Sequence, residues 1–96
     1  MKYKIKSIKH SGTYGERNSD RKDGKYPERI GRIIDFEPTE YEIEFPLILK
    51  YLELADGSDY SNRFLRCSKL VNISSTINDE IVLAETNNTI YEFERI

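Results

Sequence analysis

The residues best suited to binding chemistry lie in the first third of the chain, where basic and aromatic side chains occur close together. Cationic side chains bind phosphates and carboxylates, and aromatic rings stack on nucleobases or anchor protein interfaces. Residues 10–29 hold five Lys or Arg and four Asp or Glu, so this stretch is only weakly basic. The candidate binding residues are Tyr14, Arg17, Arg21, Lys22, Lys25, Tyr26, Arg29 and Arg32.

Three binding functions fit this pattern. The first is a non-enzymatic interaction module that presents the loop at residues 10–32 to a protein partner or to another copy of itself, because Tyr and Arg are enriched at interface hot spots. The second is a nucleic-acid-binding barrel, against which the net charge of −2 counts. The third is a phage-type inhibitor of a nucleic-acid enzyme. Its acidic face would include Glu40, Glu42 and Glu44, because residues 35–96 hold thirteen acidic and five basic residues.

Patterns for catalysis and metal binding are weak. One His and one Cys cannot supply the four ligands of a zinc site, and the spacing of Asp56, Ser58 and Asp59 does not match a calcium-binding loop. Cys67 and His10 have the residue types of a nucleophile and its base. However, Cys67 falls on the apolar face of a predicted strand, where a free thiol behaves as a small hydrophobe. We therefore predict a protein that is not an enzyme and needs no metal or cofactor.

The size and composition of the chain predict one soluble domain over residues 1–96. Of the 96 residues, 38% are hydrophobic and 33% are charged, which is typical of a globular protein. A chain this short buries about 60–65% of the surface that it exposes when unfolded. The single cysteine excludes an internal disulfide. No segment has the pattern of a targeting signal or a membrane span, so we expect a cytoplasmic protein without a membrane partner.

Period-two alternation of apolar and polar side chains predicts the strands that would position the candidate residues. A bulge is expected near Ile8, where the alternation breaks. Residues 10–28 are polar and rich in Gly, so we predict a long loop that is partly ordered and functional. For residues 47–54 a short helix beginning at Pro46 also fits, but we choose a strand because the flanking segments alternate. The expected strands cover residues 2–9, 30–37, 41–45, 47–54, 63–74, 80–85 and 89–95.

The second half of the chain carries the strongest turn signals. The Asp56-Gly57 pair predicts a hairpin within residues 55–62. The strand over residues 63–74 is expected to kink near Ser68. Its predicted inner face comprises Leu65, Cys67, Val71 and Ile73.

The last hairpin can be predicted with its register. Asn tolerates positive φ, so Asn87 and Asn88 are expected to form a two-residue type I′ turn. That turn fixes which side chains face each other, and the resulting pairs on one face are apolar. The expected inward pairs are Val82 with Phe93 and Ala84 with Tyr91. The chain therefore reads as an all-β protein, a small antiparallel barrel or sandwich of five to six strands, SH3-like or OB-like, with a long loop after the first strand.

The closing stretch Thr86–Tyr91 has the form Thr-x-Asn-[Ser/Thr]-x-Tyr and follows the stretch Phe64–Val71. Together they resemble small uncharacterised bacterial and phage β-proteins, which pair a Thr-Ser strand corner with a final strand of this form. The similarity covers roughly the last third of the chain, with a weaker likeness over residues 31–54, and Cys67 stands where a Thr is expected. The resemblance implies a small β fold and no particular activity.

Overall fold

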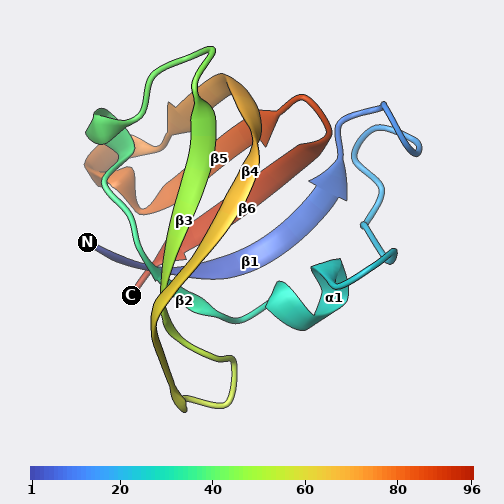
Figure 1. Cartoon of the computed structure of the whole chain (residues 1–96). Helices are drawn as coiled ribbons and strands as arrows, with labels where there is room; N and C mark the ends of the chain where they lie inside the picture. The colour runs from blue at the N-terminus through green and yellow to red at the C-terminus, as the bar shows by residue number, and fades with distance from the viewer.

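Six antiparallel strands form a closed barrel in the computed structural model, which describes all 96 residues (Figure 1). Each strand pairs with its neighbours in sequence, and the last strand pairs with the first. The prediction of a small all-β antiparallel barrel with a long loop after the first strand is confirmed. The strands are β1 (Lys2–His10), β2 (Ile33–Asp35), β3 (Pro46–Glu53), β4 (Asp59–Ser75), β5 (Ile81–Thr86) and β6 (Thr89–Arg95).

Helical structure is confined to three short segments between the strands. They are the four-residue helix α1 (Tyr26–Arg29) and the 3₁₀ turns η1 (Pro38–Glu40) and η2 (Ile77–Asp79). None of them has the length and apolar character that a membrane crossing requires.

The core consists of one cluster of thirteen buried hydrophobic side chains inside the barrel. In β3, Leu47, Leu49 and Tyr51 are buried, whereas Ile48 is 44% exposed. Burial at every second residue is the signature of a strand, because a helix would bury adjacent residues on one face. The strand predicted for residues 47–54 is therefore correct, and the alternative helix is not formed.

The closing hairpin has the predicted register. Val82 pairs with Phe93 and Ala84 with Tyr91, and all four side chains are buried. The type I′ turn, however, is wrong, because neither Asn87 nor Asn88 has a positive φ. The turn is held by contacts from outside the hairpin instead. The Asn87 N–H donates to the carbonyl of Lys69, and its carbonyl accepts hydrogen bonds from Ser11 and Thr13.

Two predicted strands in the middle of the chain differ from the structure. Residues 30–37 contribute only the three-residue β2, because Gly31 turns the chain with a φ of +88° just before it. Residues 41–45 form no strand, and Phe45 is 60% exposed. Alternation alone cannot make a strand without a continuous run of backbone hydrogen bonds to a partner. Here η1 precedes the segment, Glu44 has a positive φ, and backbone bonds to β4 are made only by Glu44 and Phe45, both with Leu70.

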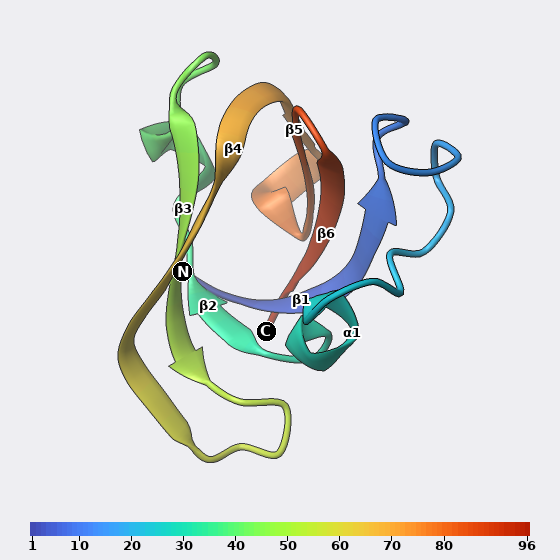
Figure 2. The same ribbon diagram turned by 45° about the vertical axis from the view of Figure 1, so that its right-hand side comes forward.

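β4 is longer and more strongly bent than predicted. Its first part pairs with β3 and its second part with β5, so this single strand turns a corner of the barrel (Figure 2). The register with β3 shifts between Arg66 and Lys69, so the kink predicted near Ser68 is confirmed. A second shift, in the pairing with β5, lies between Leu70 and Asn72. Between the two shifts the inner face changes, so Leu70 is buried and Val71, which was predicted to face inward, is 40% exposed.

β1 carries the irregularity expected near Ile8. Its pairing with β6 shifts between Ile5 and Ser7, which brings Ile8 to the inner face. Beyond Lys4, β1 has no regular strand on its other edge, because it pairs with β2 only at Lys2–Lys4. Residues of the long loop take that place instead. Five backbone hydrogen bonds join β1 to them, to Asn18, Ser19, Arg21, Gly31 and Arg32.

A matched pair of substitutions separates core packing from surface hydrophobicity. We expect Phe93→Ala to lower the free energy of unfolding by about 3–5 kcal/mol, because it empties a fully buried site. Phe64→Ala removes the same atoms from a side chain that is 64% exposed and should cost far less. Urea denaturation followed by circular dichroism measures both, and equal losses would contradict the assigned core.

Candidate functional site

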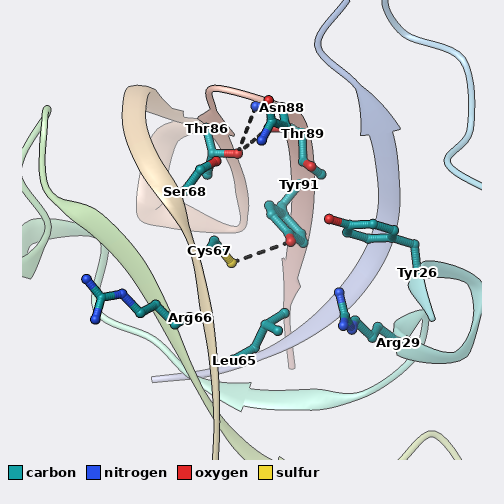
Figure 3. A pocket seen from close by; sticks show the side chains of 10 residues that line it. All are labelled: Tyr26, Arg29, Leu65, Arg66, Cys67, Ser68, Thr86, Asn88, Thr89 and Tyr91. Carbon is teal, nitrogen blue, oxygen red and sulfur yellow. Dashed lines mark hydrogen bonds between the residues drawn. The ribbon is translucent and has the colours of Figure 1, made fainter. Parts of the chain in front are cut away.

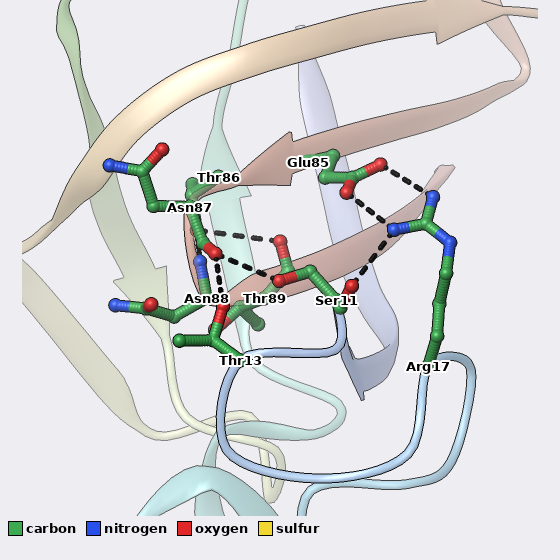
Figure 4. Close-up of polar contacts among 8 residues, drawn as sticks. All are labelled: Ser11, Thr13, Arg17, Glu85, Thr86, Asn87, Asn88 and Thr89. Atoms are coloured by element: carbon green, nitrogen blue, oxygen red, sulfur yellow. Dashed lines mark hydrogen bonds and ion pairs between the residues drawn. The ribbon is translucent and has the colours of Figure 1, made fainter.

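The long loop after β1 is fastened to the tip of the β5–β6 hairpin (Figure 4). The hydroxyls of Ser11 and Thr13 donate to the Asn87 carbonyl at 2.9 and 2.8 Å. The two terminal nitrogens of the Arg17 guanidinium each donate a hydrogen bond to the Glu85 carboxylate, at 2.7 and 2.9 Å. These contacts and the backbone bonds to β1 order the loop as predicted. Arg17, however, is already paired within the chain.

Arg21 is buried rather than displayed. Its side chain is only 5% exposed, and its guanidinium stacks on the ring of Tyr26 at 4.0 Å. The same group donates to Asp23 at 2.6 and 3.1 Å and to the Thr89 hydroxyl at 2.9 Å. Arg21 therefore positions Tyr26 and joins the loop to β6, and its charge is neutralised inside the protein.

The remaining candidates split into two groups. Tyr14, Lys22 and Lys25 are exposed, with 69% of the Tyr14 side chain accessible. Arg29 and Arg32 are half-buried and are drawn towards aromatic rings of the barrel.

Arginines and tyrosines make two sets of contacts, one on α1 and one between the end of the long loop, β3 and β4. Arg29 lies over the ring of Tyr26 at 4.8 Å, and Arg32 lies 5.1 Å from the ring of Tyr60. The guanidinium of Arg63 lies 5.5 Å from the centre of the same Tyr60 ring. Arg32 also lies 5.1 Å from the ring of a further tyrosine in β3. We call this set the arginine–tyrosine cluster: Tyr26, Arg29, Arg32, Tyr51, Tyr60 and Arg63.

No carboxylate neutralises the three arginines of the cluster. The ion pairs of the structure involve the N-terminus, Lys6, His10, Arg17 and Arg21 only. Arg29, Arg32 and Arg63 form no ion pair, although the chain holds seventeen acidic residues. Stacking on an aromatic ring orients a guanidinium and leaves its N–H edges free for an anion.

A cavity of about 100 Å³ opens beside the cluster, between α1, β4 and the β5–β6 hairpin (Figure 3). Tyr26 and Arg29 extend from α1 towards Tyr91, whereas Arg66 points away from it. The Cys67 thiol donates to the Tyr91 hydroxyl at 3.4 Å across the cavity. Its lining residues are Tyr26, Arg29, Leu65, Arg66, Cys67, Ser68, Thr86, Asn88, Thr89 and Tyr91.

The groups around this cavity are neutral donors at neutral pH. Burial raises the pKa of the Cys67 thiol, and the hydrogen bond with Tyr91 and the charge of Arg29 offset this only in part. Burial likewise raises the pKa of the Tyr91 phenol and that of Tyr51. A neutral thiol is a poor nucleophile. His10, the other half of the considered pair, faces Asp23 at 3.9 Å instead, and no three metal-ligating side chains come together.

Several residues of the site were missed by sequence reasoning. Tyr60 fell in the predicted turn, whereas β4 already begins at Asp59. Arg63 lies two residues before Leu65 and therefore on the same face of the strand as Leu65 and Cys67. Extending the predicted inner face back by two residues would have indicated Arg63. Tyr91 was expected to face the core, and both Tyr91 and Tyr51 are buried. Their hydroxyl groups also contribute polar atoms to the site.

Comparison with known proteins gives no relative from which a function could be transferred. No family model matches the chain, and neither a curated protein nor a solved structure does. What the structure defines is a class, a small closed β-barrel with an arginine–tyrosine cluster at one side.

The Arg17–Glu85 pair should be visible in a titration. The hydrogen bonds and charge of Arg17 hold the pKa of the Glu85 carboxyl below its ordinary value. The stabilisation is therefore complete above the ordinary carboxyl pKa, about 4.3, and is lost as the pH falls through the lowered pKa. NMR titration of the Glu85 side chain should show its pKa rising towards the ordinary value in Arg17→Gln. Lys22→Gln, on the same loop, should leave it unchanged, and a shift of equal size in that control would contradict the assignment.

Proposed function

We propose that this protein is a non-enzymatic binding module that receives an acidic segment of a protein partner on its arginine–tyrosine cluster. The observation that carries the proposal is the set of three arginines without a carboxylate partner in a chain with seventeen acidic residues. Folding pairs Arg17 and Arg21 with carboxylates. Among the arginines left without one, Arg29, Arg32 and Arg63 are those held against tyrosine rings.

The physical character of the cluster suits a protein interface. A guanidinium that is already stacked loses little conformational freedom when it binds a carboxylate, and it can do so through two parallel hydrogen bonds. Tyr and Arg in partly desolvated positions supply most of the binding energy at many interfaces. The interface then combines loop residues with β4, so it differs from the loop-only surface expected from sequence, and Tyr14, Lys22 and Lys25 become its flank.

The proposal assigns no catalytic step to the protein. The thiol and phenols of the cavity are neutral donors, and no base contacts Cys67. Binding an anion needs donors and positive charge, which this site has. Activating a nucleophile needs a neighbouring base, which this site lacks.

The test uses a synthetic Glu-rich peptide of twelve residues as a defined probe. We expect NMR shifts at Tyr26, Arg32 and Arg63, and a loss of affinity of about tenfold or more in Arg63→Gln, because a hydrogen bond to a charged group contributes about 1.5–3 kcal/mol. Arg66→Gln is the matched control, since Arg66 lies on the same strand but points away from the cavity. Equal effects of the two substitutions, or no shifts, would overturn the proposal.

A nucleic-acid function is the second candidate, favoured by one observation. Tyr14 offers a ring that is 69% exposed, and the exposed Lys22 and Lys25 follow on the same loop. Single strands bind by stacking on such rings, while cations follow the phosphates. An oligothymidine probe should then bind at low salt, with log K falling by roughly 0.7 per phosphate contact for each unit of log salt concentration. Tyr14→Ala should weaken that binding. If the chain binds the Glu-rich peptide and no oligonucleotide, the result supports the protein partner and excludes the nucleic acid.

A further inference from the structure

We propose that the cavity between α1, β4 and the β5–β6 hairpin is a phosphoryl-binding pocket. This proposal rests on the proposed function and specifies the anionic group that the cavity accepts. The pocket would hold the phosphoryl group alone, and the rest of the ligand would lie outside over the arginine–tyrosine cluster.

Donors reach this pocket from separate elements of the fold. Arg29 extends from α1 towards Tyr91 of β6 (Figure 3). The Cys67 thiol and the Tyr91 hydroxyl form one hydrogen bond at 3.4 Å, which uses one of their two protons and leaves the other for an outside acceptor. A tetrahedral oxyanion presents oxygens in several directions, whereas a planar carboxylate is satisfied by a single arginine fork. Convergence from different sides therefore favours a phosphoryl group.

Two buried polar atoms of the arginine–tyrosine cluster lie outside the lining of this pocket: the Tyr51 hydroxyl and the Arg32 Nε. Burial raises the pKa of the Tyr51 phenol, and the hydrogen bond and charge of Arg32 offset this only in part. Buried polar groups are satisfied in the great majority of proteins, and here the Arg32 guanidinium and the Tyr51 hydroxyl serve each other.

The charge balance of the pocket is positive. None of its ten lining residues is Asp or Glu. The tyrosines and the thiol remain protonated at neutral pH because burial raises their pKa values. They consequently add donors without adding negative charge, and a phosphoryl group carries about −1.5 to −2 charges at pH 7.

The cavity is large enough for the group. Its volume of about 100 Å³ is several times the roughly 10–15 Å³ that one water molecule needs on the same measure. That space admits a phosphoryl group.

Titration of the isotope-labelled full chain with inorganic phosphate tests the pocket. We expect saturable NMR shifts at Cys67, Thr89 and Tyr91, with binding about tenfold weaker in Arg29→Gln. Tyr91→Phe keeps the core volume and removes one donor, so it should weaken binding severalfold while the melting temperature stays close to that of the parent. Arg95→Gln and Tyr41→Phe are the matched controls and should bind phosphate like the parent chain, because neither residue lines the cavity.

Three further probes distinguish the bearer of the phosphoryl group: a phosphotyrosine peptide, its unphosphorylated form, and a nucleoside monophosphate. Tighter binding of the phosphopeptide than of inorganic phosphate supports a modified protein partner, and tighter binding of the nucleotide identifies a nucleotide instead. Absence of saturable shifts, or equal affinity of Arg29→Gln and Arg95→Gln for phosphate, would overturn the pocket. Binding of phosphate without binding of the Glu-rich peptide would refute the proposed function and leave the pocket standing.

Discussion

The pairing of β6 with β1 is the interaction on which the rest of the structure depends. It joins the two ends of the chain over Tyr3 to His10 and turns a meander of strands into a closed barrel. Closure also sets the path of the long loop. β1 ends beside the β5–β6 hairpin, but β2 pairs with the opposite end of β1, so residues 11–32 must run back along the open edge of β1. Their backbone bonds cover that edge, which would otherwise be free to pair with another chain.

This return path explains where the site lies. The loop carries α1 past the side of the barrel at the place where β4 bends from its pairing with β3 to its pairing with β5. Arg29 and Arg32 arrive there on the returning loop, and Arg63 and Tyr60 arrive on β4. The hairpin tip completes the cavity, because the same contacts that hold the loop also hold Asn87 and Asn88 in place.

The arginines of one basic segment consequently receive different roles. Arg17 and Arg21 meet carboxylates and fasten the loop, whereas Arg29 and Arg32 meet only aromatic rings. Pairing lowers the cost of keeping a charge at a partly buried position, so Arg21 can be buried and still be stable. The unpaired arginines keep their charge at the rim of the cavity, where solvent or an anion can reach them. The asymmetric charge of the chain is thus partly neutralised inside the fold and partly retained at one site.

The sequence by itself determined the all-β antiparallel class, the register of the last hairpin and the strand at residues 47–54, because burial at alternate positions is a local property of neighbouring residues. That the sheet closes into a barrel and not a sandwich was decided by the pairing of β6 with β1. It also located half of the site, in Tyr26, Arg29 and Arg32. Only the tertiary structure decided that residues 41–45 form no strand, that Arg17 and Arg21 are paired, and that Tyr60 and Arg63 join the site. These outcomes depend on contacts between residues far apart in the chain, such as Arg17 with Glu85 and Arg32 with Tyr60. Local alternation contains no information about which distant residue will arrive opposite a given side chain, and closure of the barrel supplies it.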